Sequence, residues 1–352
     1  MAWFRKNIPG IAFTFIIALI AALLGTMIPI IGGPVLGIVL GILTGNTLGK
    51  PSWSASGVKF TSKRILKLAI IVLGAGLSLT QVWKTGVESL TVMAFTLTFA
   101  FLAAYGFGRL MKIPMKLTSL IGVGTAICGG SAIAAISPII EAEEKDVAYS
   151  ISTIFFFNII AVLIFPPLGH LLGFSDKAFG LWAGTAVNDT SSVVAAGYAF
   201  SNAAGAFATI VKLTRTTMII PISLIFAVAT AISRKKKKAA SNAADNTADV
   251  AADNAANNTS INYSFRNIFP WFILGFLTTS LMNTMGLFRW DSAHFLSEAG
   301  KFLIIMALTA IGLGADIKKM LKTGIKPLLL GMTVWFVVAA VSIIAQLITG
   351  QI

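Results

Sequence analysis

The stretch from Leu328 to Ile348 reads LLLGMTVWFVVAAVSIIAQLI and contains no charged residue. An α-helix needs about 20 apolar residues to cross the hydrocarbon core of a bilayer, so this stretch predicts a transmembrane helix. Similar runs extend from Ile8 to Ile28 and from Leu90 to Phe107. Of the 352 residues, 56% are hydrophobic and 11% are charged, whereas roughly a quarter are charged in soluble globular proteins. The composition argues against a water-soluble enzyme and predicts an all-α polytopic membrane protein.

Apolar residues divide the chain into about eleven segments, each predicted to be a transmembrane helix. The segments are 8–28, 34–48, 67–82, 89–108, 117–140, 148–172, 179–201, 206–232, 266–287, 302–317 and 327–349. The long gap at 234–260 starts with RKKKK and continues mainly in Ala, Asn, Asp and Ser. Such a composition cannot bury enough apolar surface to offset chain ordering, so we expect a flexible cytoplasmic linker. It divides one integral membrane domain into residues 1–233, with helices one to eight, and residues 261–352, with helices nine to eleven.

The charged residues predict the orientation of the chain. There are 27 Lys and Arg against 13 Asp and Glu. The basic residues gather in alternate loops, as they do in the cytoplasmic loops of membrane proteins. The loop with Glu141, Glu143, Glu144 and Asp146 would then face the other side. We therefore expect a cytoplasmic N-terminus, an external C-terminus, contact with membrane lipid and no nucleic-acid partner.

One acidic residue lies deep inside an apolar segment. Asn188, Asp189 and Thr190 are about ten residues from either end of segment 179–201, near the bilayer midplane. An ionisable group at that depth is costly and is by default a functional candidate. We expect the three residues at the substrate site, with Asp189 coupling protons or balancing charge. The alternative is a carboxylate that only holds helices together. Asn158, in another segment, either lines a cavity or bridges helices.

Lys212 and Arg215 place two cations in segment 206–232. A spacing of three puts both on one helix face. Each costs about 2.5–3.5 kcal/mol at the bilayer centre, so the pair needs a negative partner. Asp189 supplies only one negative charge, and the surplus favours an anionic substrate. The alternative for Lys212 is that its side chain reaches the membrane surface.

Glycine-rich interruptions mark two further segments. Residues 122–131 read GVGTAICGGS, and a helix broken there would expose backbone N–H groups to an anion. The candidate binding residues in this stretch are Thr125, Cys128, Gly129, Gly130 and Ser131. Residues 309–314 read TAIGLG and add Gly312 and Gly314, with Asp316 as a second coupling candidate. Interrupted helices in two halves of a chain point to a transport site.

Not every glycine suggests a site. A four-residue spacing of glycines in segment 34–48 predicts a smooth stripe for helix packing. The stripe consists of Gly33, Gly37, Gly41 and Gly45. Two pairs of stretches also resemble each other: GTAICGGSAIAA at 124–135 resembles GTAVNDTSSVVA at 184–195, and residues from Lys67 resemble those from Lys301. One duplication does not explain both pairs, so the repeat equivalents stay open.

At these motifs the chain resembles the YeiH-type family of bacterial inner-membrane proteins, described as sulfate exporters. The resemblance spans nearly the whole chain outside 234–260, and its motifs lie at 124–134, 188–197, 211–215 and 310–316. Members often carry a His-acid pair where this chain has Asn-Asp. The family is similar to the cation/proton antiporter and anion transporter group. That likeness implies two inverted five-helix repeats in which segments five and ten are broken and cross.

From these observations we expect a secondary transporter of a small inorganic or organic anion, such as sulfate or another sulfur oxyanion, that works by alternating access. The alternative is a cation/proton antiporter, for example for Na⁺, in which Asp189 and Asp316 bind the cation. A passive channel is a further alternative. We expect no enzyme, because His170 and His294 lie near segment ends without a catalytic spacing, and no cofactor or metal, because Cys128 is the only cysteine. Whether the chain forms a homodimer stays open.

Overall fold

The computed structural model describes residues 2–28, 32–47, 49, 51–244, 270–316 and 324–352. These residues form an all-helical structure, which confirms the predicted class. Six of the described helices are long and apolar enough to cross a membrane. They are Lys6–Met27, Leu79–Leu110, Glu144–Leu171, Asn202–Ser233, Asp291–Gly314 and Ile325–Ile348.

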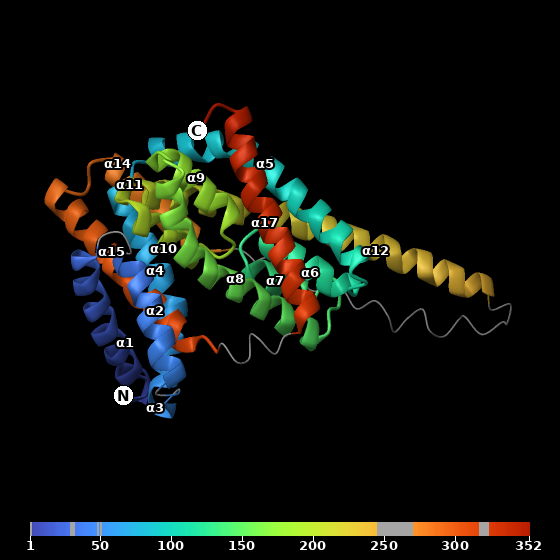
Figure 1. Ribbon diagram of the computed structural model, residues 1–352, viewed down its shortest axis with the longest axis horizontal. Coiled ribbons are helices and arrows are strands. Elements are labelled where there is room, and N and C mark those ends of the chain that lie inside the picture. The colour runs from blue at the N-terminus through green and yellow to red at the C-terminus, as the bar shows by residue number, and fades with distance from the viewer. Residues whose placement is uncertain (1, 29–31, 48, 50, 245–269, 317–323) are drawn as a thin grey trace.

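A first bundle lies on the left of Figure 1. Its helices are α1 (Ala2–Met27), α2 (Gly32–Thr47), α3 (Ser52–Phe60), α4 (Leu66–Leu73), α14 (Phe272–Thr284) and α15 (Trp290–Gly314). A π-turn, Thr61–Ile65, joins α3 to α4, so this helical run begins well before the predicted segment 67–82. The run ends in a short 3-10 turn, Gly74–Gly76.

The glycine stripe of α2 packs against α15, as its spacing predicted. A Cβ on Gly37 would lie 2.9 Å from the Thr309 hydroxyl, and one on Gly45 would lie 2.6 Å from the Leu313 carbonyl oxygen. Only glycine permits this approach of the two backbones. The stripe therefore fixes α2 and α15 to each other.

The second bundle surrounds α8 (Glu144–Leu171). Its other helices are α5 (Leu79–Leu110), α6 (Met115–Ala126), α7 (Gly130–Ile136), α9 (Asp176–Ala186), α10 (Thr190–Phe200), α11 (Asn202–Thr217) and α17 (Ile325–Ile348). Trp182 of α9 stacks on Phe165 of α8 with ring centroids 4.0 Å apart. Its indole N–H donates to the Ala339 carbonyl of α17 at 3.1 Å. Aromatic packing thus joins three helices of this bundle.

Small aliphatic side chains separate the two bundles. Val194 and Ala195 of α10 and Val162 of α8 share one buried apolar cluster with residues of α2, α4 and α15. The residues from those three helices are Val35, Ile38, Ala69, Leu73, Ile304 and Leu308. Each bundle therefore has its own helix packing, and an apolar seam lies between them.

Helix α12 (Ile219–Ala244) follows α11 and projects from the bundles at the right of Figure 1. The predicted linker at 234–260 consequently begins inside a helix, because the structure continues α12 to Ala244. This corrects the predicted boundary: strings of Lys and Ala have good helix propensity and can extend an existing helix. Residues 245–260 of that linker lie outside the described residues.

Helices α9 and α10 form a hairpin that returns to the end of α8 from which it starts. The Ser201 hydroxyl, just after α10, donates to the Asp176 carboxylate at the start of α9 at 2.5 Å. The Phe179 and Phe200 rings stack at 4.0 Å, and Phe200 also stacks on His170 near the end of α8 at 4.1 Å. This hairpin, called hairpin 2, therefore begins with α9 and ends with α10 at the Leu171 end of α8.

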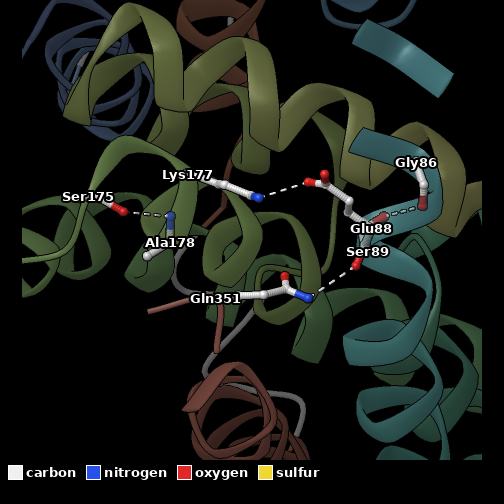
Figure 2. A network of polar contacts seen from close by, with 7 residues as sticks. All are labelled: Gly86, Glu88, Ser89, Ser175, Lys177, Ala178 and Gln351. Atoms are coloured by element: carbon white, nitrogen blue, oxygen red, sulfur yellow. Dashed lines mark hydrogen bonds and ion pairs between the residues drawn. The ribbon is translucent and has the colours of Figure 1, made fainter. Parts of the chain in front are cut away.

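Figure 2 shows how hairpin 2 is held at this end. Lys177 of α9 forms an ion pair with Glu88 of α5 at 2.8 Å. The side-chain amide of Gln351, near the C-terminus, donates to the Glu88 carbonyl at 3.3 Å. The Ser175 hydroxyl caps α9 by accepting from the Ala178 N–H at 3.2 Å. The start of α5, hairpin 2 and the C-terminus thus meet at one surface.

Helices α6 and α7 form a second hairpin, called hairpin 1, at the opposite end of α8. The Lys116 ammonium at the start of α6 donates to the Glu141 carbonyl, which follows α7, at 2.6 Å. Between the arms, a Cβ on Gly124 would lie 2.9 Å from Cδ1 of Ile133. The chain then enters α8 directly at Glu144. The two hairpins therefore enter the bundle from opposite ends of α8.

Three predictions are corrected by this arrangement. Segments 117–140 and 179–201 fold back instead of crossing, so they are not two of eleven transmembrane helices. Residues 309–314 do not interrupt a helix, because α15 continues from Trp290 to Gly314. The pair of interrupted segments is five and seven, not five and ten. The cost of glycine within α15, about 1 kcal/mol, is offset by close packing against α2.

The acidic loop lies at the same end of the bundle as a basic loop, whereas the sequence predicted opposite ends. Glu141 lies beside Lys116, so the loop shares the end of α8 that holds the basic turn between α5 and α6. The ion pair between Glu143 and Lys145, at 2.7 Å, has side chains 63% and 66% exposed. The nearby ammonium holds the pKa of Glu143 below its usual value. Acidic residues contribute little to membrane orientation, so the basic bias keeps its meaning.

Candidate functional site

The tips of the two hairpins meet beside the middle of α8. A Cβ on Gly129, in hairpin 1, would lie 3.5 Å from the Cβ of Asp189, in hairpin 2. The Asp189 N–H donates to the Asn158 side-chain oxygen at 3.1 Å. At 1.5 Å per residue, Asn158 is roughly 20 Å from either end of α8. The predicted residues Thr125 to Ser131 and Asn188 to Thr190 are therefore brought together.

Lys212 of α11 binds the C-terminal ends of α6 and α9, which are the first arms of hairpin 1 and hairpin 2. Its ammonium donates to the Ile127 carbonyl at 2.8 Å and to the Val187 carbonyl at 2.9 Å. These residues are the C-caps of α6 and α9, where helix carbonyls have no partner within the helix. The side chain is 0% exposed, so Lys212 does not reach the membrane surface.

Arg215 makes the same kind of contact one turn further along α11. Its Nε donates to the Ala126 carbonyl at 2.6 Å and its Nη2 to the Thr125 carbonyl at 3.0 Å. Its Nη1 donates to the Thr185 carbonyl in hairpin 2. Arg215 is also 0% exposed. The guanidinium fork thus spans both hairpins.

Backbone carbonyls are the negative partners that the two cations need. The C-terminal end of a helix carries about half a negative charge, and here two such ends converge. From the sequence we expected carboxylates or a bound anion as partners. Every residue has a backbone carbonyl, so the sequence does not show which carbonyls accept hydrogen bonds. The similarity between 124–135 and 184–195 has a counterpart here. Matching residues, Thr125 with Thr185 and Ile127 with Val187, present their carbonyls to the same cations.

The second arms begin differently. Asp189 caps α10: its Oδ2 accepts from the Ser191 N–H at 3.0 Å and also from the Ser191 hydroxyl. Helix α7 follows Gly129, which has φ +68° and ψ −130° and provides no side-chain cap. A positive φ of this kind is readily adopted only by glycine. A carboxylate therefore stands at one tip and a bare backbone turn at the other.

Two carboxamides at the tips have unpartnered atoms. Both polar atoms of the Asn188 side chain and the Asn158 Nδ2 are buried without a hydrogen-bond partner. The two residues are 1% and 2% exposed. Asn158 therefore bridges α8 to hairpin 2 through its oxygen while its amino group stays unused. Cys128 is a buried free thiol, whereas Ser131 is exposed on α7.

A cavity of about 460 Å³ lies between the bundles. Phe155 and Ile159 of α8 line one side, and Lys59 lines the other. A Cβ on Gly130 would lie 3.9 Å from the Phe155 ring, so the cavity wall adjoins the tip of hairpin 1. The cavity is close to the Glu144 end of α8, since Ile151 also lines it.

The predicted residues of segment 302–317 are not at the tips. Gly314 and Asp316 line the cavity. Gly312 packs against α2, where a Cβ would lie 2.9 Å from the Ile42 nitrogen. Gly312 thus packs against α2 within the continuous helix α15, and its assignment to the substrate site stays a prediction. Within the described residues, no group of three His, Cys, Asp or Glu side chains could hold a metal ion.

Comparison with known proteins assigns the chain to a family. The family model described as conserved hypothetical protein 698 matches residues 9–331. The chain belongs to this family. A UPF0324 membrane protein of Clostridium tetani is 44% identical over 354 residues, which cover 100% of both chains. One from Streptococcus agalactiae serotype V is 41% identical over 99% of both chains, and one from Fusobacterium nucleatum is 42% identical over 98% of this chain and 99% of its own.

These UPF0324 relatives are bacterial and are described as membrane proteins. Together with six long apolar helices among the described residues, they make this chain a multi-pass membrane protein. Neither the family description nor the names of these relatives mention sulfate or transport. The sulfate-exporter function implied by the YeiH-type resemblance therefore stays a prediction.

Proposed function

We propose that this UPF0324 protein is a secondary transporter of a small anion, such as sulfate or another sulfur oxyanion, and that it works by alternating access. The observation that carries the proposal is the meeting of two hairpins, from opposite ends of α8, near the middle of that helix. Non-helical backbone at membrane depth is tolerated only where protein buries it or a water-filled cavity borders it. Broken helices at the midplane are typical of transporter binding sites.

The charges at the tips favour an anion. Lys212 and Arg215 contribute two positive charges. The C-terminal ends of α6 and α9 together offset about one of them, and the Asp189 carboxylate offsets the other. The N-terminal ends of α7 and α10 also point at this place and add about one positive charge between them. The result is a small positive surplus, which suits a small anion better than a cation.

Orientation follows from the basic residues at the Glu144 end of α8. Arg109, Lys112 and Lys116 lie at the turn between α5 and α6, and Lys59 lines the cavity near the same end. Under the positive-inside rule this end is cytoplasmic, which keeps the N-terminus inside and the C-terminus outside. The 460 Å³ cavity would then admit substrate from the cytoplasm, in keeping with export across the inner membrane.

Asp189 is the coupling residue in this proposal. Its carboxylate is partly exposed, unlike the two cations, and is the only acidic side chain of the hairpin tips. The competing function is a cation/proton antiporter, and Asp316 on the cavity wall is the observation that favours it. In neither case does the site perform bond-making chemistry, so we propose no enzymatic activity.

Flux in proteoliposomes tests the proposal. Proteoliposomes that contain the purified protein and are loaded with unlabelled sulfate or sulfite should take up external radiolabelled sulfate in exchange. This uptake should not require Na⁺. Strict dependence on a Na⁺ gradient without anion flux would reject the anion transporter in favour of the antiporter. Conductances too large for a carrier would indicate a channel.

An aspartate exchange separates coupling from structure. Asparagine caps a helix about as well as aspartate. The free energy of unfolding of Asp189→Asn should therefore stay within about 0.5 kcal/mol of wild type. It should nevertheless remove the pH dependence of sulfate flux. The matched control is Asp176→Asn, which makes the same exchange at the start of α9, away from the tips. A normal pH profile in Asp189→Asn would remove Asp189 from the coupling role.

A further inference from the structure

The least satisfied polar groups of the described structure lie at its centre. Asn188 has no partner for its side-chain nitrogen or oxygen, and Asn158 has none for its side-chain nitrogen. Buried polar groups are almost always hydrogen-bonded, because an orphaned group costs about 1–3 kcal/mol. The two carboxamides are neighbours, since the Asn158 oxygen accepts from the residue after Asn188. The orphaned atoms therefore belong to two residues at the same hairpin tip, and we refer to them together as the carboxamide cluster.

The buried cations are poorly placed to bind a substrate directly. Lys212 and Arg215 are 0% exposed, and every hydrogen bond described for their side chains runs to a hairpin carbonyl. Turning either side chain toward a ligand would leave the ends of α6 and α9 without a partner. These cations hold the two tips in place and supply a field, and the described bonds occupy two of the three N–H groups of Lys212 and three of the five of Arg215. A substrate with several oxygen acceptors needs further donors that are not tied to the hairpin carbonyls.

The carboxamides supply those donors. An amide group offers two N–H donors and one oxygen acceptor. With the Asn158 oxygen already used, the pair retains four N–H donors against one free oxygen. Reversing the Asn188 amide exchanges the positions of its atoms but not this count. A donor-rich cluster fits an anion with several oxygen acceptors. A bare cation, by contrast, requires several oxygen ligands.

The cavity leads toward this cluster. Phe155 and Ile159, which line the cavity, flank Asn158 along α8 at three positions before it and one position after it. Gly130, at the tip of hairpin 1, lies beside the Phe155 ring. Rotation of the Phe155 ring, or a shift of α8 against the first bundle, would join the 460 Å³ space to the amides.

We propose that Asn158 and Asn188 are the direct ligands of the transported oxyanion, and that Lys212 and Arg215 are positioning residues. This inference rests on the proposed transport function and assigns its binding groups. Asn158 takes part in two ways: its oxygen fixes hairpin 2 by accepting from the Asp189 N–H, and its amino group faces the substrate. The selectivity of the site for oxyanions over chloride comes from the number of amide donors that one substrate can engage.

The experiment compares three variants with wild type in sulfate binding and in flux. Asn188→Ala removes only unpartnered atoms, so the protein should fold as wild type. Asn158→Asp keeps the acceptor for Asp189, removes both donors and adds a carboxyl group that itself disfavours an anion. The control is Gln346→Leu on α17, another buried carboxamide with an unpartnered oxygen but outside the tips. Binding is read from the thermal shift of detergent-purified protein with added sulfate, and chloride is the reference anion.

We expect the Kd for sulfate to rise about tenfold to a hundredfold in each asparagine variant, because each loses two hydrogen bonds to a charged ligand. The ratio of sulfate to chloride flux should fall with it, and Gln346→Leu should match wild type. Wild-type sulfate binding and selectivity in a folded Asn188→Ala would overturn the inference while leaving transport intact. Absence of anion flux in the wild-type protein would instead reject the proposed function, and the inference with it.

Discussion

Hairpin 1 and hairpin 2 treat the ends of their first arms alike and the starts of their second arms differently. In both, carbonyls at matching positions of the first arm are bound by Lys212 and Arg215. The second arm of hairpin 2 begins under the Asp189 carboxylate, whereas that of hairpin 1 begins at Gly129 without a side-chain cap. The shared half of the arrangement stabilises the tips. The half that differs is where a substrate or a proton can act.

The largest expected effect tests whether the two hairpins enter the bundle from opposite ends of α8. Single cysteines replacing Lys116 and Lys145 should both be protected from a membrane-impermeant thiol reagent in intact cells. A cysteine replacing Lys177 should be labelled, because these positions lie at opposite ends of the bundle. The background is Cys128→Ala, which removes the buried native thiol. Different labelling of positions 116 and 145 would show that residues 115–143 cross the membrane, as the sequence alone predicted.

The next effect tests the contacts that both hairpins share, in which first-arm carbonyls are bound by the cations of α11. Arg215→Ala leaves three buried carbonyls from both hairpins without their donor. At about 1–3 kcal/mol for each orphaned group, the variant should lose several kcal/mol of stability. Thermal unfolding in detergent measures the loss.

Two further variants calibrate that result. Arg215→Lys restores the charge but not the planar fork, so it should recover only part of the loss. Arg109→Ala removes an exposed arginine that bonds the Tyr105 hydroxyl at 3.2 Å, and it should change stability by less than about 0.5 kcal/mol. A stable Arg215→Ala protein that still transports sulfate would contradict the role of Arg215 as the brace between the hairpins.

The smallest effect tests the feature that differs between the hairpins, which is the start of the second arm. Gly129→Ala forces a side chain onto φ +68° and ψ −130°, which costs about 1–3 kcal/mol. Its Cβ would also lie 3.3 Å from Ile154. Gly130→Ala places the same methyl group one residue later, where the nearest atom is 3.9 Å away, and should leave stability unchanged or slightly raised. Equal melting temperatures for the two variants would show that the turn of hairpin 1 needs no glycine.

Much of this molecule could be predicted from its sequence. Long uncharged runs identify the spans, and glycines four residues apart identify the contact between α2 and α15. The grouping of Asp189 with the cations of α11 and the glycine turn was also predicted. It follows from physics: polar groups at the same depth in an apolar medium gather because each needs a partner.

What the sequence hid was the path of the backbone. A segment of some twenty apolar residues has the same composition whether it crosses or folds back, so 179–201 was assigned as a span. The signals of its return, Asp176 with Ser201 and Phe179 with Phe200, are evident only once the two ends are known to meet. The carbonyl partners of Lys212 and Arg215 were equally hidden, because every residue carries a carbonyl.

The apolar seam between the bundles has a mechanical consequence. Its buried contacts on the α10 side come from the short side chains of Val194, Ala195 and Ala199, and the larger Tyr198 packs against the same cluster. Because dispersion forces have no preferred direction, one methyl contact can replace another as such faces slide. In the proposed transport cycle, the α2 and α15 pair, interlocked by glycine, would stay rigid while the hairpins move past it.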